Sequence, residues 1–227
     1  MDFVTTIKNQ VLVIDGAMGT QVQNLELTDA DYGGVEFKML PDILVFSHPD
    51  AIKNIHLAYF RAGANAVETN TFGATPFRLA EYDFSHLDLT AFADNPYNVD
   101  LRALSHEDMA YHMSKRAAEI ACEARVEYKR DPQYDGRPLF VLGSIGPSNR
   151  VLSCTDANLK LSTFDEMMDN FHVQVLGLID GGADVLLYET QQDILEVKAA
   201  VLGGQRAMRE RGKKLPIMVQ VTVDRFS

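Results

Sequence analysis

Acidic side chains stand at the ends of several short apolar runs in this sequence. Asp15 closes the run VLVID, Glu68 lies in ANAVETN, and Glu189 lies in ADVLLYET. A carboxylate at the end of a buried strand is costly unless a cation faces it. Asp15 and Glu189 are therefore candidates to bind an ammonium group, although an internal cation could serve Glu189 equally well. The chemistry predicted here is recognition of an amine.

Two loops add small polar groups after such runs. ETNTFGAT carries Asn70 and Thr71, and GSIGPSNR carries Ser144 and Gly146. The backbone N–H groups of the second loop suit a carboxylate ligand. Both loops could instead be ordinary turns, the first of them capping a helix.

A third loop, DGAMGT at residues 15–20, contains Gly16. It matches neither the dinucleotide-binding glycine motif nor a P-loop, and no helix is indicated directly after it. Its glycines could simply permit a tight turn.

Metal and nucleophile motifs cannot be identified from spacing. The six histidines are scattered, and neither H-x₃-H nor C-x₂-C occurs. We expect Cys122 to be a small core residue in an alanine-rich helix, and we do not expect Cys154 to be a metal ligand. No catalytic residue and no metal ligand is predicted within this chain.

Composition excludes several classes of protein. The 227 residues carry 21 Lys and Arg against 32 Asp and Glu, a net charge of −11, which argues against nucleic acid or an anionic membrane as the main partner. Two cysteines are too few for a disulfide framework and favour a reducing compartment. No apolar run suits a membrane span or a signal peptide, so a cytoplasmic location is expected.

The elements that position these residues alternate between strands and helices. Five runs rich in Val, Ile and Leu predict parallel strands covered on both faces, at residues 11–15, 64–70, 139–146, 183–190 and 215–224. Helices are predicted from Pro49 to Gly63, after a capping box of Thr163 and Glu166, and from Ile194 to Gly212. Residues 83–105 lack a clean period and are predicted to form a surface insertion.

Polar groups follow all five predicted strands, including Thr222 and Asp224 after the last. A shared polar rim favours a (β/α)₈ barrel over a doubly wound sheet. Only five of the eight strands are found, so we expect a barrel truncated to about five β/α units. The first and fifth strands would then have open edges, which predicts low stability or self-association.

Five motifs in one order carry a family resemblance: DGAMGT, GANAVETNTFGAT, LGSIGPSNR, FHVQVLGLIDGGADVLLYETQQDILEVKAAV and LPIMVQVTVD. Together they resemble the homocysteine-binding domain of the homocysteine S-methyltransferase family, and among its branches the cobalamin-dependent methionine synthases. The resemblance covers residues 11–224 apart from the insertion. It implies that residues 1–227 are the N-terminal part of one homocysteine-binding barrel domain.

The resemblance also implies roles for individual residues. Asp15, with Gly16 beside it, and Glu189 match the two acids that hold the substrate amine. Other substrate-binding positions are matched by Glu68, Asn70, Thr71, Ser144, Gly146, Thr222 and Asp224. Zinc, held by three cysteine thiolates in the family, would coordinate the homocysteine thiol, but those cysteines lie beyond Ser227 in the family pattern.

In the cobalamin-dependent branch that this chain resembles, the methyl group comes from methyltetrahydrofolate through methylcobalamin. Both cofactors bind on other modules, which belong to the same chain or to a separate one. The isolated chain is therefore expected to be inactive. Two alternatives stay open: a betaine- or S-methylmethionine-dependent methyltransferase, and a non-catalytic truncated or split domain that docks a partner or binds a ligand.

Overall fold

The protein is a parallel sheet with helices packed along one side. The computed structural model describes residues 2–92, 97, 99–153 and 162–223. The sheet has four strands in the order β1-β2-β3-β4. Their bounds are β1 Ala66–Glu68, β2 Phe140–Ile145, β3 Val185–Gln191 and β4 Ile217–Val221.

The first predicted strand, at residues 11–15, is wrong as a full strand. Only Ile14 pairs, in an isolated parallel bridge to Ala66. Val11 and Val13 are 90% and 56% exposed, whereas Leu12 and Ile14 are partly buried, so the run is covered on one face and not on both as its composition suggested. The bridge nevertheless places Asp15 beside β1: its amide donates to the carbonyl of Ala66 over 2.9 Å, and its carboxylate reaches Glu68 at the carboxyl end of the strand.

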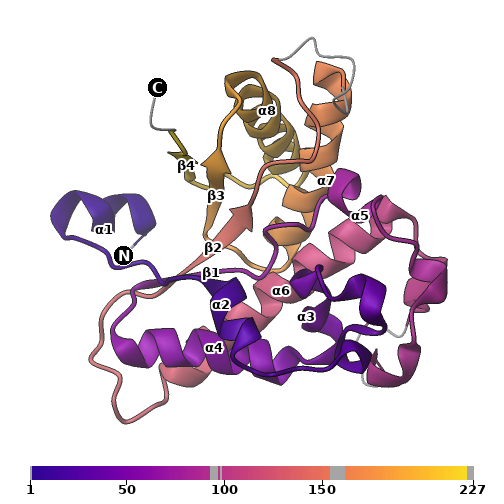
Figure 1. Ribbon diagram of the computed structural model, residues 1–227. Coiled ribbons are helices and arrows are strands. Elements are labelled where there is room, and N and C mark those ends of the chain that lie inside the picture. The colour runs from indigo at the N-terminus through magenta and orange to yellow at the C-terminus, as the bar shows by residue number, and fades with distance from the viewer. Residues whose placement is uncertain (1, 93–96, 98, 154–161, 224–227) are drawn as a thin grey trace.

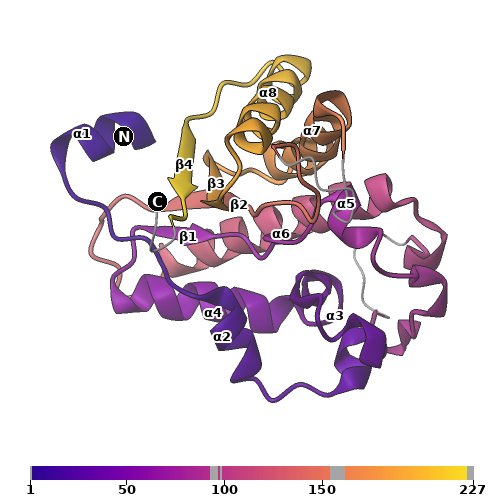
Figure 2. The ribbon, with the colours of Figure 1, turned by 45° about the horizontal axis from the view of Figure 1, so that its top comes forward.

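Four long helices cover the outer face of the sheet: α4 (Pro49–Ala62), α6 (His106–Tyr128), α7 (Phe164–Asp180) and α8 (Ile194–Glu210). Neighbouring helices of this row pack on each other, as Figures 1 and 2 show. The predicted signals are confirmed: Gly63 ends α4 with φ 113°, and the Thr163–Glu166 capping box opens α7.

Shorter helices connect the strands and the four long helices. The short α-helices are α1 (Phe3–Asn9), α2 (Met18–Gln23), α3 (Leu44–Ser47) and α5 (Pro76–Leu79). The 3₁₀ helices are η1 (Asp29–Tyr32), η2 (Val35–Phe37), η3 (Pro41–Ile43), η4 (Phe84–His86), η5 (Leu89–Phe92) and η6 (Leu101–Ala103). Contrary to the sequence-based expectation, a helix starts at the DGAMGT motif, because α2 begins at Met18 within it.

The two faces of the sheet differ in what they contact. Outward-facing side chains such as Val141 and Leu186 pack against the helices. The alternate, inward-facing side chains form a separate cluster that includes Phe140, Leu142 and Leu187. At the opposite end from the strand carboxyl termini, Phe3 of α1 closes this cluster edge-on against Phe140, with ring centroids 5.1 Å apart.

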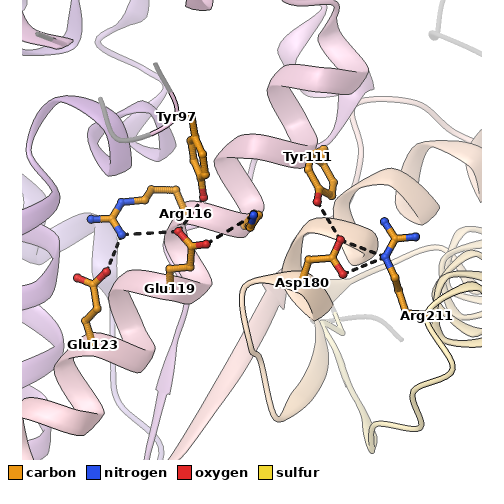
Figure 3. Close-up of polar contacts among 8 residues, drawn as sticks. Tyr97, Tyr111, Arg116, Glu119, Glu123, Asp180 and Arg211 are labelled. Carbon is orange, nitrogen blue, oxygen red and sulfur yellow. Dashed lines mark hydrogen bonds and ion pairs between the residues drawn. The ribbon is translucent and has the colours of Figure 1, made fainter. Parts of the chain in front are cut away.

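The described part of residues 83–105 packs beside α6 rather than in the sheet. Its apolar side chains, including Phe84 and Leu101, are buried in the same cluster as α3 and α6. Tyr97 donates to Glu119 of α6 over 2.7 Å (Figure 3). Figure 3 also shows Asp180, at the end of α7, accepting from Tyr111 of α6 and from Arg211, which follows α8. The first contact holds Tyr97 against α6, and the contacts of Asp180 link α6, the end of α7 and the end of α8.

Within the described residues, no helix is both long enough and apolar enough to span a membrane.

Candidate functional site

A cavity of about 700 Å³ opens where the carboxyl ends of the strands meet. Strands alternate their side chains between the two faces of a sheet. The inward-facing set is apolar along most of the strands and becomes polar at their carboxyl ends, with Glu68, Ser144, Glu189 and Gln220 from β1 to β4. The cavity therefore lies above the inward-facing apolar cluster, with a polar floor.

Seven of the ten predicted site residues line this cavity: Asp15, Gly16, Glu68, Asn70, Thr71, Ser144 and Glu189. They come from the loop after the Ile14 bridge, from β1 and its following loop, and from the ends of β2 and β3. The positions predicted from motifs far apart in sequence are thus brought into one space.

Asp15 is held by the backbone of β1. Both of its carboxylate oxygens accept from the Glu68 amide, at 3.1 and 3.0 Å. Burial raises the pKa of Asp15 to about 7, and the nearby Glu189 carboxylate adds to the rise, while the amide hydrogen bond opposes it. These hydrogen bonds fix the Asp15 side chain in place but only partly offset the cost of burying its negative charge.

For Glu68, the cost of burying the negative charge is offset even less than for Asp15. The Glu68 carboxylate makes no hydrogen bond with any described residue, and burial, with Glu189 and then Asp15 adding negative charge, raises its pKa to about 8. Three carboxyl groups sharing one low-dielectric cavity cannot all ionise readily, because each charge opposes the others.

Glu189 is the third carboxyl group. It accepts a hydrogen bond from the Ser144 hydroxyl of β2. Burial raises the pKa of Glu189, and the Ser144 hydrogen bond acts in the opposite direction. Ser144 therefore favours the ionised form of Glu189.

The polar residues after β1 have hydrogen-bond partners within the protein. The Asn70 amide donates to the Pro41 carbonyl over 2.8 Å, and the Thr71 hydroxyl donates to the Ser144 carbonyl over 2.7 Å. These contacts fix the loop against β2 and against η3. Asn70 and Thr71 thus shape the cavity wall.

Gly146 and Thr222 do not line the cavity. Gly146 is buried, and a Cβ there would lie 2.6 Å from the Phe72 carbonyl oxygen, so a close backbone approach explains this glycine. Thr222 is exposed, and its backbone amide donates to the Gln191 carbonyl over 2.8 Å. Gln220 occupies the cavity wall in its place. Asp224 and Cys154 lie outside the described residues.

Sequence reasoning missed Asp42, Lys38 and Arg78, which also line the cavity. Asp42 is 3% exposed and accepts from the Gly73 amide over 2.9 Å; burial raises its pKa to about 6, against the opposing charge of Arg78. The acidic residue inside the apolar stretch LPDILVF was a usable signal, because such a residue must find a partner. Lys38 forms an ion pair with Asp29, and Arg78 forms one with Glu81. Among the described residues, their ion pairs are therefore with residues other than Asp15, Glu68 and Glu189.

The residues present do not fit a zinc ion. Among those described, no three His, Cys, Asp or Glu side chains are arranged to hold a metal. Cys122 lies on α6, half-buried, with its thiol donating to the Gly182 carbonyl over 3.3 Å, away from the cavity. The described site lacks the thiolate and imidazole donors that zinc prefers.

Chemically, the cavity is suited to a ligand that carries a positive charge on a small body. A primary ammonium placed among Asp15, Glu68 and Glu189 would supply the cation that these carboxylates lack, since Lys38 and Arg78 pair elsewhere. The arrangement can bind and orient such a ligand, and the Ser144 hydroxyl, which donates to Glu189, stabilises the charge of that carboxylate.

Comparison with known proteins agrees with this geometry. The chain is 37% identical over 223 residues to methionine synthase of Mycobacterium leprae and 38% identical over 224 residues to that of Mycobacterium tuberculosis. These alignments cover 98% of the chain but 16% of each relative, so the chain spans about a sixth of their length.

Solved structures of the homocysteine methyltransferase MmuM from Escherichia coli share the fold. The oxidised and metallated forms each superpose with a TM-score of 0.64 at 22% identity, covering 93% of this chain and 62% to 63% of theirs. The parallel β/α arrangement is therefore that of this barrel family, and the expected fold class is confirmed.

The sequence of residues 12–227 matches the family described as homocysteine S-methyltransferase. The fold, the order of the motifs and this match lead to one conclusion: the chain belongs to the homocysteine S-methyltransferase family.

Proposed function

We propose that this chain is the homocysteine-binding part of a methionine synthase, and that it holds the amino-acid end of homocysteine. The observation that carries the proposal is the cluster of Asp15, Glu68 and Glu189, which share a cavity of about 700 Å³ without a committed cation. In the reaction, the homocysteine thiol would lose its proton, and its sulfur would bond to a methyl group as the bond between that methyl group and its donor breaks, which gives methionine. The chain contributes binding and orientation of the substrate.

The complete enzyme is proposed to need more than this chain. Zinc ligands for the thiol would come from residues that follow Ser227 in the family pattern, since the described residues provide no such site. The methyl group would come from methyltetrahydrofolate through methylcobalamin, on modules in cis or in trans. The similarity to two methionine synthases favours this donor over betaine or S-methylmethionine.

We further propose that residues 1–227 are the N-terminal portion of one barrel domain, with residues 83–105 as an insertion. The low cysteine content favours the cytoplasm as its location. Self-association through open strand edges is proposed for the chain by itself.

The function is tested by calorimetric titration of L-homocysteine, L-methionine and 4-(methylthio)butanoate, the analogue of methionine without its amine. We expect the amine-bearing ligands to bind at least tenfold more tightly, because a charged hydrogen bond contributes about 1.5–3 kcal/mol. Asp15→Asn and Glu189→Gln should each remove most of that preference.

Asp165→Asn is the matched control, because Asp165 is exposed in the first turn of α7 and does not line the cavity. If both site variants bind the three ligands as the unaltered chain does, the assignment of the amine site is wrong. If the chain prefers the ligand without an amine, the proposed function fails.

A further inference from the structure

Strand β3 is irregular at the point where it reaches the cavity. Tyr188 pairs with Val219 of β4, but the next pair is Gln191 with Val221, so β3 has one residue more than β4 in this interval. Thr190 lies in the extra segment with φ 57°. This is a β-bulge, a feature that redirects side chains at the end of a strand.

The bulge changes which side chain faces the ligand. In a regular strand, Gln191 would share the inward face with Glu189. Here Glu189 lines the cavity, whereas Gln191 is fully buried and forms no part of the cavity wall. The irregularity therefore leaves Glu189 as the last side chain of β3 that faces the ligand, and places Gln191 behind it.

Gln191 connects the backbone around Glu189 to both neighbouring strands. Its side-chain amide donates to the Glu189 carbonyl over 3.1 Å and to the Ile145 carbonyl of β2 over 3.4 Å. Its own carbonyl accepts from the Thr222 amide, just after β4, over 2.8 Å. One buried residue thus links the ends of three strands.

These contacts oppose the conformational strain at Thr190. A β-branched residue with positive φ is a true outlier, and such backbone persists only where its surroundings enforce it. The Gln191 amide donates to the carbonyls of Ile145 and Glu189, so Thr190 cannot relax without disturbing a buried and a part-buried hydrogen bond.

We propose that Gln191 is a positioning residue: by bracing the bulge at Thr190, it fixes the Glu189 carboxylate where a substrate ammonium group meets it. The inference rests on the proposed function, because it takes an amine-bearing amino acid as the ligand of this cavity. Gln191 itself does not touch the ligand.

The test measures one ratio, the affinity for L-methionine divided by that for 4-(methylthio)butanoate. In Gln191→Met, which keeps length but loses the amide, the ratio should fall about tenfold, as expected for loss of an oriented charged contact. Val175→Ala is the control: Val175 is fully buried on α7 outside the cavity, so this variant loses stability without moving Glu189. Its ratio should stay unchanged.

Two further variants separate positioning from a general loss of structure. Thr190→Gly keeps the bulge accessible, because glycine adopts positive φ without strain, and should keep the ratio. In a Glu189→Gln background, Gln191→Met should produce no additional loss, since the group that it positions is already neutral. Gln191→Asn, whose amide is too short to reach both carbonyls, should also lower the ratio and serves if Gln191→Met does not fold.

A folded Gln191→Met or Gln191→Asn variant that keeps the full ratio would overturn the inference while leaving the proposed function standing. Additive losses in the double variant would overturn it too. If the unaltered chain shows no preference for the amine-bearing ligand, the proposed function and this inference fail together.

Discussion

The Ser144 hydroxyl donates a hydrogen bond to the Glu189 carboxylate, and this contact joins the carboxyl ends of neighbouring strands β2 and β3. A donor to a carboxylate stabilises its charged form. The contact is therefore the main local feature that keeps Glu189 able to attract a cation in spite of its burial.

Replacing Ser144 with Ala should weaken binding of an amine-bearing ligand roughly tenfold near pH 7, because a hydrogen bond to a charged group contributes about 1.5–3 kcal/mol. The pKa of Glu189 should rise, so the deficit should shrink as the pH is raised. Titrations of L-methionine at pH 6.5, 7.5 and 8.5 check this.

Ser114→Ala is the control for that experiment, because the Ser114 hydroxyl is buried on α6 without a hydrogen-bond partner among the described residues. A pH-independent deficit in Ser144→Ala would show that Ser144 acts by shape alone.

Stability should fall with rising pH because of Glu68. Its pKa is raised from 4.5 to about 8. Below about pH 4.5 the Glu68 carboxyl is protonated in both the folded and the unfolded state, and its contribution to the free energy of unfolding is fully present. Between pH 4.5 and 8 the folded protein keeps a proton that the unfolded chain has released, so this contribution is lost as the pH rises through the folded pKa.

Glu68→Gln removes this penalty. Thermal unfolding at pH 6 and pH 9 should show the variant gaining on the unaltered chain at the higher pH by about 5 °C, for a penalty discounted to about 2 kcal/mol. Glu107→Gln, at an exposed position in the first turn of α6, should show no such gain. An equal difference at both pH values would contradict the assignment of a raised pKa.

Binding of an amine should release protons. A bound ammonium lowers the pKa values of Asp15 and Glu68, about 7 and about 8 without ligand, and that of Glu189. At pH 7.5 we expect on the order of one proton per L-methionine bound. Methionine has no thiol to ionise, so the proton must come from the protein.

Calorimetry in phosphate and in Tris measures this number, because the two buffers take up protons with different heats. Glu68→Gln should reduce the release, and affinity should weaken as the pH falls below about 7. Identical heats in the two buffers would contradict the prediction.

Gly146→Ala should destabilise the fold by about 1–3 kcal/mol, since the added carbon meets the Phe72 carbonyl oxygen at 2.6 Å. Gly19→Ala is the matched control, because nothing lies within 4 Å of the corresponding position and Gly19 is in helix α2. Urea unfolding compares them. A Gly146→Ala variant as stable as the unaltered chain would remove the steric explanation for this glycine.

Self-association is expected through the outer edge of β4. Val219 and Val221 are 43% and 67% exposed, and no described strand pairs with that edge. Sedimentation should show mass increasing with concentration, and Val221→Lys should shift the chain toward monomer. Val126→Lys on α6, also an exposed valine, is the control. A monomer at all concentrations would contradict the prediction.

Much of this arrangement could be predicted from sequence because its signals are local. The capping box at Thr163 and the stop at Gly63 depend on neighbouring residues, and α7 and α4 have those bounds. The acids Asp15 and Glu189 could be predicted because a charged residue at the end of an apolar run needs a partner.

The errors come from features that depend on distant contacts. The run at residues 11–15 has a strand composition, yet only Ile14 finds a pairing partner. Thr222 was predicted at the cavity because it follows the last predicted strand and matches a family position, but the bulge at Thr190 shifts the register of β3 against β4, and Thr222 is exposed. One additional residue in a strand leaves no mark on composition or spacing.

The strand order has a consequence for how the molecule is made. Each strand pairs with the strand that precedes it in the chain, from β1 to β4, so every new β/α unit leaving the ribosome meets a finished template. The sheet can grow in the direction of translation, because the partner of each new strand has already been synthesised. The acidic cluster is completed before the last β/α unit: Asp15 and Glu68 are synthesised early, and Glu189 joins them once β3 has been synthesised, with α8 and β4 still to follow. In a nascent chain these three carboxyl groups therefore meet only after β1, β2 and the helices between them have been made.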